Sequence, residues 1–297
     1  MILLLGATGC LGTQVLRRLL TKRLPVRIIA RGQVDWQSPL ADRFKAQGVE
    51  VRYADFLQPD KLADAITGCD AVINTIGSMN FKDLDNLHEA NFQIAKNLIE
   101  VTDQCGVQRF IQIGCLGASE KSKSAYLQSK WQADKLVQES KCDWTILRPS
   151  FMFGEKFQVK ELLAPVVRFP AFLPVFGSGV NLVQPVSVEN VAECILMSLY
   201  DRTTVRQTFE LAGPELLTMS KFLEMLRENA GRAGGIINIP LDVTRNTASF
   251  LTKGLPKQFF NTELLELLTG DSASSRNDLK DKFGIDGATL SSYVTSS

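Results

Sequence analysis

Tyr126 and Lys130, four residues apart in "SAYLQSK", are the pair in this sequence whose types and spacing most directly suggest chemistry. Positions i and i+4 lie on the same face of an α-helix, so both side chains can point into one crevice. A lysine ammonium beside a phenol favours the phenolate and lowers the tyrosine pKa from its ordinary value of about 10. The pair therefore predicts a site that exchanges a proton with an alcohol or carbonyl oxygen.

A glycine loop near the N-terminus predicts what lies beside this pair. In "LLLGATGCLG" three glycines recur at three-residue intervals between an apolar strand and a helix. Such glycines allow a tight turn, close approach of the backbone to a pyrophosphate, and close packing of helix on strand. The helix N-terminus adds unpaired N–H groups for the phosphates. We expect a bound dinucleotide, held here by Gly6, Thr8, Gly9, Cys10, Leu11 and Gly12.

Short β-branched runs alternate with amphipathic stretches through the first half of the chain, which is typical of βαβ units and a parallel sheet. This predicts an α/β fold: a Rossmann-type, doubly wound parallel sheet with a smaller C-terminal α+β lobe. The expected strands are Ile2–Leu5, Val26–Ala30, Val49–Tyr53, Ala71–Thr75, Arg109–Ile113 and Trp144–Leu147. The expected helices are Leu11–Lys22, Pro59–Thr67, Leu84–Cys105 and Ser124–Ser140.

The alternation breaks down after Ser150, which predicts two domains. Residues 1–150 form the dinucleotide-binding domain, and residues 151–297 form the smaller lobe for a substrate or a partner. Segments near residues 184–213 are expected to return to the first domain. In this half we expect helices at Val188–Tyr200, Ser220–Asn229 and Thr262–Leu268, and a strand at Thr208–Leu211.

The ends of the second, third and fourth strands suggest which dinucleotide is bound. Arg31 follows the second strand, where an acid would favour NAD and an arginine can pair with the 2′-phosphate of NADP. NADP is therefore preferred, with NAD as the alternative. Asp55 and Phe56 end the third strand and are expected at the adenine, while Gly77 allows the backbone after the fourth strand to approach the cofactor.

Composition limits the other possibilities. The chain has 33 basic and 32 acidic residues, a net charge of +1, which argues against nucleic acid as a partner. One histidine, His88, and six scattered cysteines predict no metal site, and the thiols suggest a reducing compartment.

A strand follows Met1 directly, so we expect no targeting peptide and a cytoplasmic location, or an organelle interior if a transit peptide was removed. The longest apolar stretch is broken by prolines and predicts no transmembrane segment, although it could contact a membrane peripherally.

The quoted motifs resemble those of the extended, atypical short-chain dehydrogenases/reductases. The matching segments are "GATGCLG", "YADF", "NTIG", "SAYLQSK" and "WTILRPSFMFG", in the family's order. Within that superfamily the chain is most similar to the NmrA-like group and to the branch containing the 39 kDa accessory subunit of respiratory complex I. Later segments such as "FELAGPELLTMSKFLEML" extend the resemblance over nearly the whole chain.

The resemblance implies roles for individual residues. Tyr126 and Lys130 match the catalytic tyrosine and lysine, and they would also hold the cofactor. Asn91 matches a helix asparagine near that site and would support a proton-relay water, and Pro149 matches a proline bordering the nicotinamide. The family's serine is missing, because Gly114 stands at its position. Ser119, Ser122 and Ser124 in the following loop are the possible substitutes.

Two functions remain open from the sequence. One is an NADPH-dependent reductase of a small or apolar carbonyl compound, with Tyr126 as proton donor. The other is a catalytically weak accessory or assembly protein that binds the cofactor and docks on a protein of a membrane complex, through "RFPAFLPVFG" and "FLTKGLPKQFF". A sugar-nucleotide epimerase is a third alternative, against which Gly114 and Arg31 both count.

Overall fold

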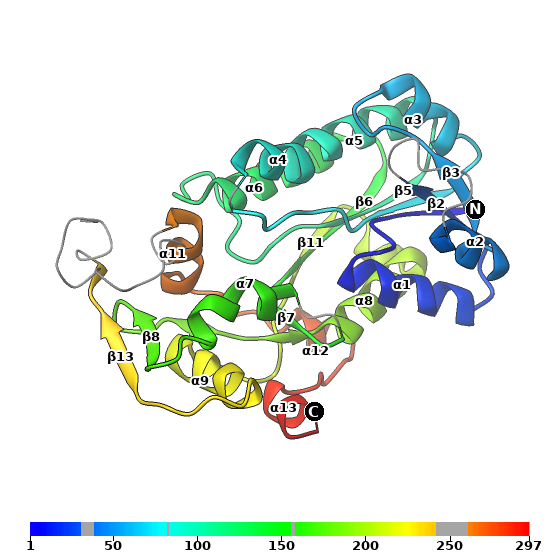
Figure 1. The fold of residues 1–297 in the computed structure, drawn as a ribbon. Coiled ribbons are helices and arrows are strands. Elements are labelled where there is room, and N and C mark those ends of the chain that lie inside the picture. The colour runs from blue at the N-terminus through cyan, green and yellow to red at the C-terminus, as the bar shows by residue number, and fades with distance from the viewer. Residues whose placement is uncertain (31–38, 82, 156–157, 242–260, 297) are drawn as a thin grey trace.

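A seven-stranded parallel sheet forms the centre of the molecule (Figure 1). The computed structural model describes residues 1–30, 39–81, 83–155, 158–241 and 261–296. The strand order is β11-β6-β5-β4-β1-β2-β3. From β1 the chain adds β2 and β3 on one side of the sheet and then β4, β5 and β6 on the other side. In parallel sheets of this kind, ligands bind in the crevice at the carboxyl ends of the two strands where the order switches, here β1 and β4. The strands are β1 (Ile2–Leu5), β2 (Val26–Ala30), β3 (Glu50–Tyr53), β4 (Ala71–Asn74), β5 (Arg109–Ile113), β6 (Asp143–Pro149) and β11 (Gln207–Leu211).

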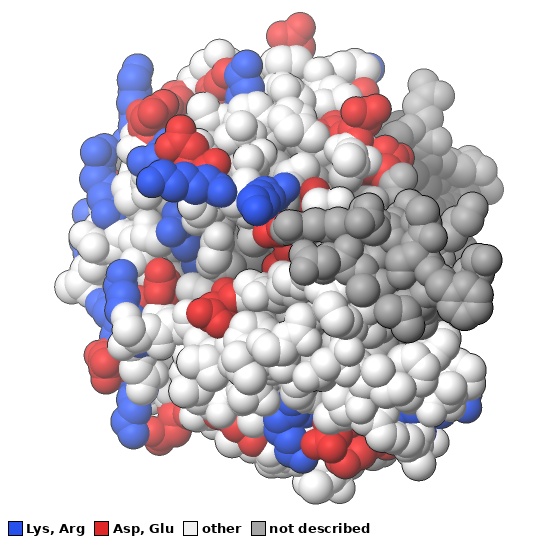
Figure 2. Space-filling model, turned by 90° about the vertical axis from the view of Figure 1, so that its left-hand side faces the viewer, with Lys and Arg blue, Asp and Glu red and all other residues white. Residues whose placement is uncertain are grey.

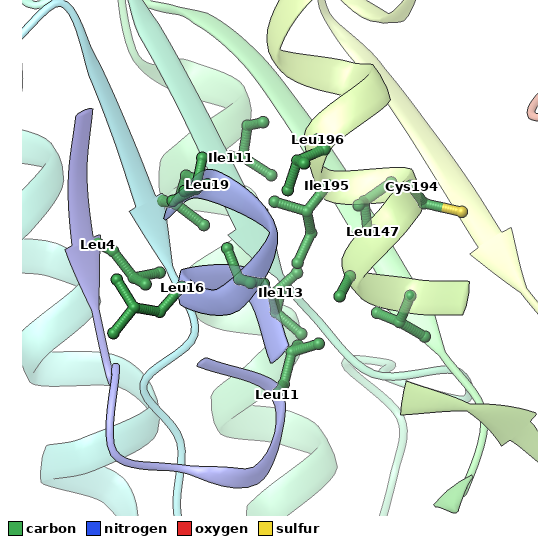
Figure 3. Close-up of a cluster of buried hydrophobic side chains, with 14 of the residues drawn as sticks. Leu4, Leu11, Leu16, Leu19, Ile111, Ile113, Leu147, Cys194, Ile195 and Leu196 are labelled. Atoms are coloured by element: carbon green, nitrogen blue, oxygen red, sulfur yellow. The ribbon is translucent and has the colours of Figure 1, made fainter. Parts of the chain in front are cut away.

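Helices cover both faces of this sheet because its strands are apolar on both sides. Leu4 faces α1 (Cys10–Thr21) and α8 (Val188–Tyr200), whose leucines and isoleucines meet it in the cluster of Figure 3. Its neighbours Leu3 and Leu5 point the other way. They pack in the cluster that holds α3 (Pro59–Ile66), α5 (Ile94–Gln104) and α6 (Ala125–Glu139).

The predicted α/β class is confirmed, and all seven expected strands and most expected helices lie within two residues of their observed bounds. The single helix expected at Leu84–Cys105 is wrong in one respect: it consists of α4 (Leu84–His88), a π-helical turn η1 (Glu89–Gln93) and α5. Helix α2 (Pro39–Ala46) was not predicted.

The second half of the chain has its own apolar cluster, built around Phe153, Phe176 and Phe222. It contains three two-stranded sheets, β10-β7, β12-β9 and β13-β8. Strand β11 lies in the central sheet and pairs with β6, while α8 packs against α1. The division into two domains at residue 150 remains a prediction.

The remaining elements are β7 (Met152–Phe153), α7 (Gln158–Val167), β8 (Leu173–Phe176), β9 (Leu182–Val183), β10 (Val186–Ser187), η2 (Arg202–Thr204), β12 (Leu217–Thr218), α9 (Met219–Asn229), β13 (Ile236–Ile239), α11 (Thr262–Thr269), α12 (Asp278–Asp281) and α13 (Leu290–Ser296).

The surface carries charges of both signs. On the face shown in Figure 2, lysines and arginines are interspersed with aspartates and glutamates, in keeping with the net charge of +1. Within the described ranges, no helix combines the length and the apolar character needed to cross a bilayer.

Candidate cofactor site

A cavity of about 310 Å³ opens at the carboxyl ends of the central strands, on the side where β1 and β4 diverge. It brings the glycine loop, the strand ends and the tyrosine–lysine pair together. Predicted site residues that line it are Gly6, Thr8, Gly9, Cys10, Leu11, Gly12, Gly77, Tyr126, Lys130 and Pro149.

The glycine loop leaves the start of α1 open toward this cavity. Gly6 has a φ of +79°, a conformation that disfavours side chains, and a Cβ on Gly12 would lie 2.0 Å from the Gly6 carbonyl oxygen. Helix α1 has no side-chain cap at Gly9 and no acidic residue in its first turn. Its N-terminal N–H groups and partial positive charge are thus available to an anion such as a pyrophosphate.

Helix α6 positions the tyrosine and the lysine. Ser124 caps the helix by accepting a hydrogen bond from the Leu127 amide at 3.2 Å. Lys130 is buried, and its Nζ donates to the Ile113 carbonyl at 3.3 Å. Tyr126 is also buried and packs edge-on against Phe81, with 5.9 Å between the ring centroids.

Gly77 faces the lysine directly. A Cβ at this position would lie 2.8 Å from the Lys130 Nζ, so a side chain there would require the ammonium group to shift. Gly77 lines the cavity, and its contact with a cofactor stays a prediction.

The expected lowering of the Tyr126 pKa by Lys130 is wrong in this structure. Burial disfavours the phenolate and raises the pKa of Tyr126 well above its usual range, and the neighbouring Cys115 thiol raises it further. Burial also lowers the pKa of Lys130, against the opposing effects of Cys115 and Asp134. The direction of this shift favours the neutral phenol over the phenolate.

The place of the missing serine side chain is filled by another residue. A Cβ on Gly114 would lie 2.8 Å and 2.9 Å from the two carboxylate oxygens of Asp134 and 3.0 Å from Cγ of Arg148. Asp134 is fully buried, and its Oδ2 accepts a hydrogen bond from Arg148 Nε at 2.7 Å. Glycine at residue 114 therefore leaves room for the Asp134–Arg148 ion pair, which a serine side chain would crowd.

Asp134 belongs to the same buried charge cluster as Lys130, one helical turn away on α6. Burial raises the pKa of Asp134 to about 6, while Arg148 and Lys130 act to lower it. Its Oδ1 has no hydrogen-bond partner among the described residues. Residues 126, 130 and 134 follow the i, i+4 spacing that places side chains on one face of a helix.

The three serines proposed as substitutes do not reach the cavity. None of them is among its lining residues. The hydroxyl oxygens of Ser119 and Ser122 accept hydrogen bonds from the amides of Lys121 and Ser124, at 3.2 Å and 3.1 Å. Besides Tyr126, the hydroxyl-bearing residues that line the cavity are Thr8, Thr75, Ser78, Ser150 and Ser272.

A family model matches the part of the chain that forms most of the cavity wall. Residues 6–201, about two thirds of the chain, match the family described as NAD(P)H-binding. The chain belongs to this NAD(P)H-binding family. The predicted resemblance to the branch that contains the 39 kDa accessory subunit of complex I is confirmed by the relatives, which include such subunits.

The chain is also similar to two relatives and to one solved structure. Subunit 9 of the mitochondrial NADH dehydrogenase [ubiquinone] 1 alpha subcomplex of Arabidopsis thaliana is 29% identical, over 93% of this chain and 71% of the relative. The photosystem II assembly factor Ycf39 of Trieres chinensis is 26% identical, over 81% and 72%. An NADPH-dependent quinone oxidoreductase from Escherichia coli, complexed with NADPH, has the same fold, with a TM-score of 0.75, 20% identity, and coverage of 100% and 99%.

Other residues predicted for the NAD(P)H site lie outside the cavity lining. Asn91 is in the π-helical turn, and its side chain donates to the carbonyls of Ser78 and Leu87 and accepts from the Ser78 amide. It therefore fixes the loop after β4, and its support of a proton relay remains a prediction. Asp55 accepts from the Leu57 amide, and Phe56 is buried. Their adenine contact also stays a prediction, and Arg31 lies outside the described residues.

Sequence reasoning missed the contribution of the C-terminal half to this cavity. Residues Glu266, Leu267, Gly270, Asp271 and Ser272 form part of its wall. Ser150, which follows Pro149, donates to the Ser272 carbonyl at 2.7 Å and ties this wall to the end of β6. The only sequence signal was the segment "ELLTGDSASS", which contributed to the family resemblance but suggested no contact.

Proposed function

We propose that the protein holds NADP(H) in this crevice as a structural ligand and acts as an accessory or assembly protein of a membrane-associated complex. The observation that carries the proposal is the pair Gly114 and Asp134. The Asp134 carboxylate lies where a side chain at residue 114 would begin, whereas the glycine loop, Tyr126 and Lys130, which would hold the cofactor, all line the cavity.

The crevice residues fit a nicotinamide dinucleotide. The open start of α1, from Gly9 to Gly12, would receive the pyrophosphate. Lys130 would hold the nicotinamide ribose, and Pro149 would border the ring. Arg31 would pair with the 2′-phosphate and favour NADP over NAD, with Asp55 and Phe56 toward the adenine. When bound, the cofactor supplies a hydride, and it also stabilises the folded state by mass action.

The accessory role is supported by the chemistry of the site and by the relatives. Losing one stabilising donor from such a site costs roughly 2.7–4 kcal/mol in the barrier, or on the order of a hundredfold to a thousandfold in rate. The two relatives named above are a respiratory-complex subunit and an assembly factor. Peripheral contact with a membrane through a protein partner follows from this proposal.

Cofactor binding and turnover must be measured separately. NADPH titration of the purified protein should raise its melting temperature, by an amount equivalent to about 2.7 kcal/mol at a hundredfold excess over Kd. NADPH consumption over a panel of carbonyls and quinones should stay near background and be equal for wild type and Tyr126→Phe. Affinity purification from the native membrane fraction should recover a protein partner. A chain recovered alone and wholly soluble contradicts the accessory role.

The second candidate is an NADPH-dependent reductase of a small or apolar carbonyl compound. It is favoured by the neutral Tyr126 phenol and by the apolar residues around it in the cavity wall, among them Met79, Leu127, Phe151 and Leu267. Substantial turnover that falls at least tenfold in Tyr126→Phe, with NADPH affinity retained, would establish this activity and displace the structural role.

A further inference from the structure

Glu263 reaches the helix that carries the tyrosine–lysine pair from the far end of the chain. It lies at the start of α11 and is only 6% exposed. Its carboxylate accepts three hydrogen bonds: from the Ser124 hydroxyl at 2.5 Å, the Ala125 amide at 2.9 Å and the Tyr126 amide at 3.1 Å. All three donors stand at the N-terminus of α6.

This carboxylate completes the cap of α6. The first N–H groups of a helix have no partner within the helix and carry a partial positive charge, so a buried acceptor that is itself negative satisfies both needs. Ser124 accepts from the Leu127 amide, and Glu263 accepts from the two amides before it. Helices α4, α8 and α9 are capped by the residue that precedes them, whereas α6 receives a second acceptor 139 residues away in sequence.

The same segment forms a wall of the cofactor crevice. Leu267 and residues 270–272 line the cavity. At the start of α11, Asn261 donates to the Phe81 carbonyl at 2.9 Å, and the Phe81 ring packs on Tyr126. Both Tyr126 on α6 and the segment that caps α6 therefore border the space that a ligand would occupy.

We propose that Glu263 is a positioning residue that couples occupancy of the crevice to the docking of α11, through the first turn of α6. Undocking of α11 leaves the Ala125 and Tyr126 amides without their acceptor, and Tyr126, the second residue of the helix, frays with them. A ligand that needs Tyr126 and Lys130 in place thereby favours the docked segment. Thermodynamic reciprocity requires the docked segment to favour the ligand by the same factor. The proposal rests on the proposed cofactor binding.

The test compares NADPH binding and amide hydrogen exchange in wild type, Glu263→Ala, Glu263→Gln and the control Thr218→Ala. Thr218 caps α9 through the Lys221 amide and is not among the cavity-lining residues, so its loss reports the effect of a missing cap alone. Glu263→Ala should raise the NADPH Kd about tenfold, because hydrogen bonds to a charged acceptor are lost. Glu263→Gln keeps one acceptor oxygen and should fall in between. Thr218→Ala should lower the melting temperature and leave Kd unchanged.

Hydrogen exchange distinguishes coupling between the crevice and α11 from a general loss of fold stability. In wild type, NADPH should slow exchange in residues 124–127 and 261–272 together, and in Glu263→Ala the protection of residues 261–272 should disappear. An unchanged Kd in Glu263→Ala, or full protection of residues 261–272 in that variant, overturns the proposal. If Glu263→Ala does not fold, Glu263→Gln is judged by the same two criteria.

A failure of cofactor binding can be told apart from a failure of coupling. If wild type does not bind NADPH, the proposed function is wrong, and the coupling is then judged without NADPH. Glu263→Ala must accelerate exchange in residues 124–127 as well as in residues 261–272. Acceleration confined to residues 261–272 overturns the role of Glu263.

Discussion

The carboxylate of Asp134 occupies the space that a side chain at Gly114 would need, since a Cβ there would lie 2.8 Å from Asp134 Oδ2. Gly114→Ser should therefore destabilise the fold by about 1–3 kcal/mol, the usual cost of overpacking a buried site. It should not raise NADPH consumption, because the new hydroxyl displaces the Asp134–Arg148 pair. Thermal unfolding and a turnover assay on the purified variant measure the two effects.

Gly235→Ser provides the control for this substitution, because a Cβ at Gly235 meets no atom within 4 Å. Its melting temperature should match that of wild type. A Gly114→Ser variant that is as stable as wild type and gains reductase activity would show that the serine position is open.

The buried carboxyl of Asp134 should make stability depend on pH. Its pKa is raised to about 6 in the fold, mainly by burial, from an unfolded value near 3.8. Between these values the folded state binds more protons, so stability falls as pH rises from about 4 to about 6. The slope is at most about 1.4 kcal/mol per pH unit. Asp134→Asn should remove this slope in unfolding curves measured from pH 4 to pH 7.

Asp201→Asn provides the control, because the fold lowers the pKa of Asp201 whereas it raises the pKa of Asp134. The Lys282 ammonium, by its hydrogen bond, holds the pKa of the Asp201 carboxyl at about 2. Its contribution is fully present above the unfolded pKa and is lost only as pH falls toward 2, so it should not change between pH 4 and pH 7. Equal pH profiles for wild type and Asp134→Asn would contradict the raised pKa.

Substitution by alanine should be far more damaging at Gly12 than at Gly9. A Cβ on Gly12 would meet the Gly6 carbonyl oxygen at 2.0 Å, whereas a Cβ on Gly9 would lie 3.3 Å from the same atom. Gly12→Ala should therefore lower the melting temperature strongly and abolish NADPH binding, since the loop must open. Gly9→Ala should keep most of the stability. Calorimetric titration with NADPH distinguishes the two variants, and equal behaviour would argue against the packing role of Gly12.

Arg31 should determine the choice between the two dinucleotides. A guanidinium paired with the 2′-phosphate contributes a charge-assisted hydrogen bond that NADH cannot make. Arg31→Ala should raise the Kd for NADPH about tenfold and leave the Kd for NADH nearly unchanged. If Arg31→Ala raises the Kd for NADPH and the Kd for NADH by the same factor, Arg31 does not contact the 2′-phosphate.

The fold of the first half could be predicted because its signals are local. The strand Ile2–Leu5, the glycine turn and the helix after it occupy adjacent residues, and their order alone specifies parallel βαβ units. The tyrosine and lysine were placed in the crevice for the same reason, since helix spacing and strand order suffice to locate them. The π-helical turn at Glu89–Gln93 was missed because its amphipathic pattern resembles that of an ordinary helix.

The rest depended on tertiary contacts that have no local signal. The sequence shows that Gly114 lacks a hydroxyl, but not that Asp134 fills the space. The pKa of Tyr126 was predicted in the wrong direction because the sequence reveals a neighbouring charge and not the extent of burial, which dominates here. Glu263 and Ser124 lie 139 residues apart, and only the folded chain brings them together.

The pairing of β11 with β6 affects how the chain can fold during synthesis. Strand β6 ends at Pro149, but its outer neighbour is not made until Gln207–Leu211. Until those residues leave the ribosome, the backbone N–H and C=O groups on the edge of β6 that faces away from β5 lack their partner strand, and an open edge of this kind is a template for aggregation. A nascent chain stalled between these two points should therefore need a chaperone, and a fragment ending at residue 150 should aggregate when expressed alone.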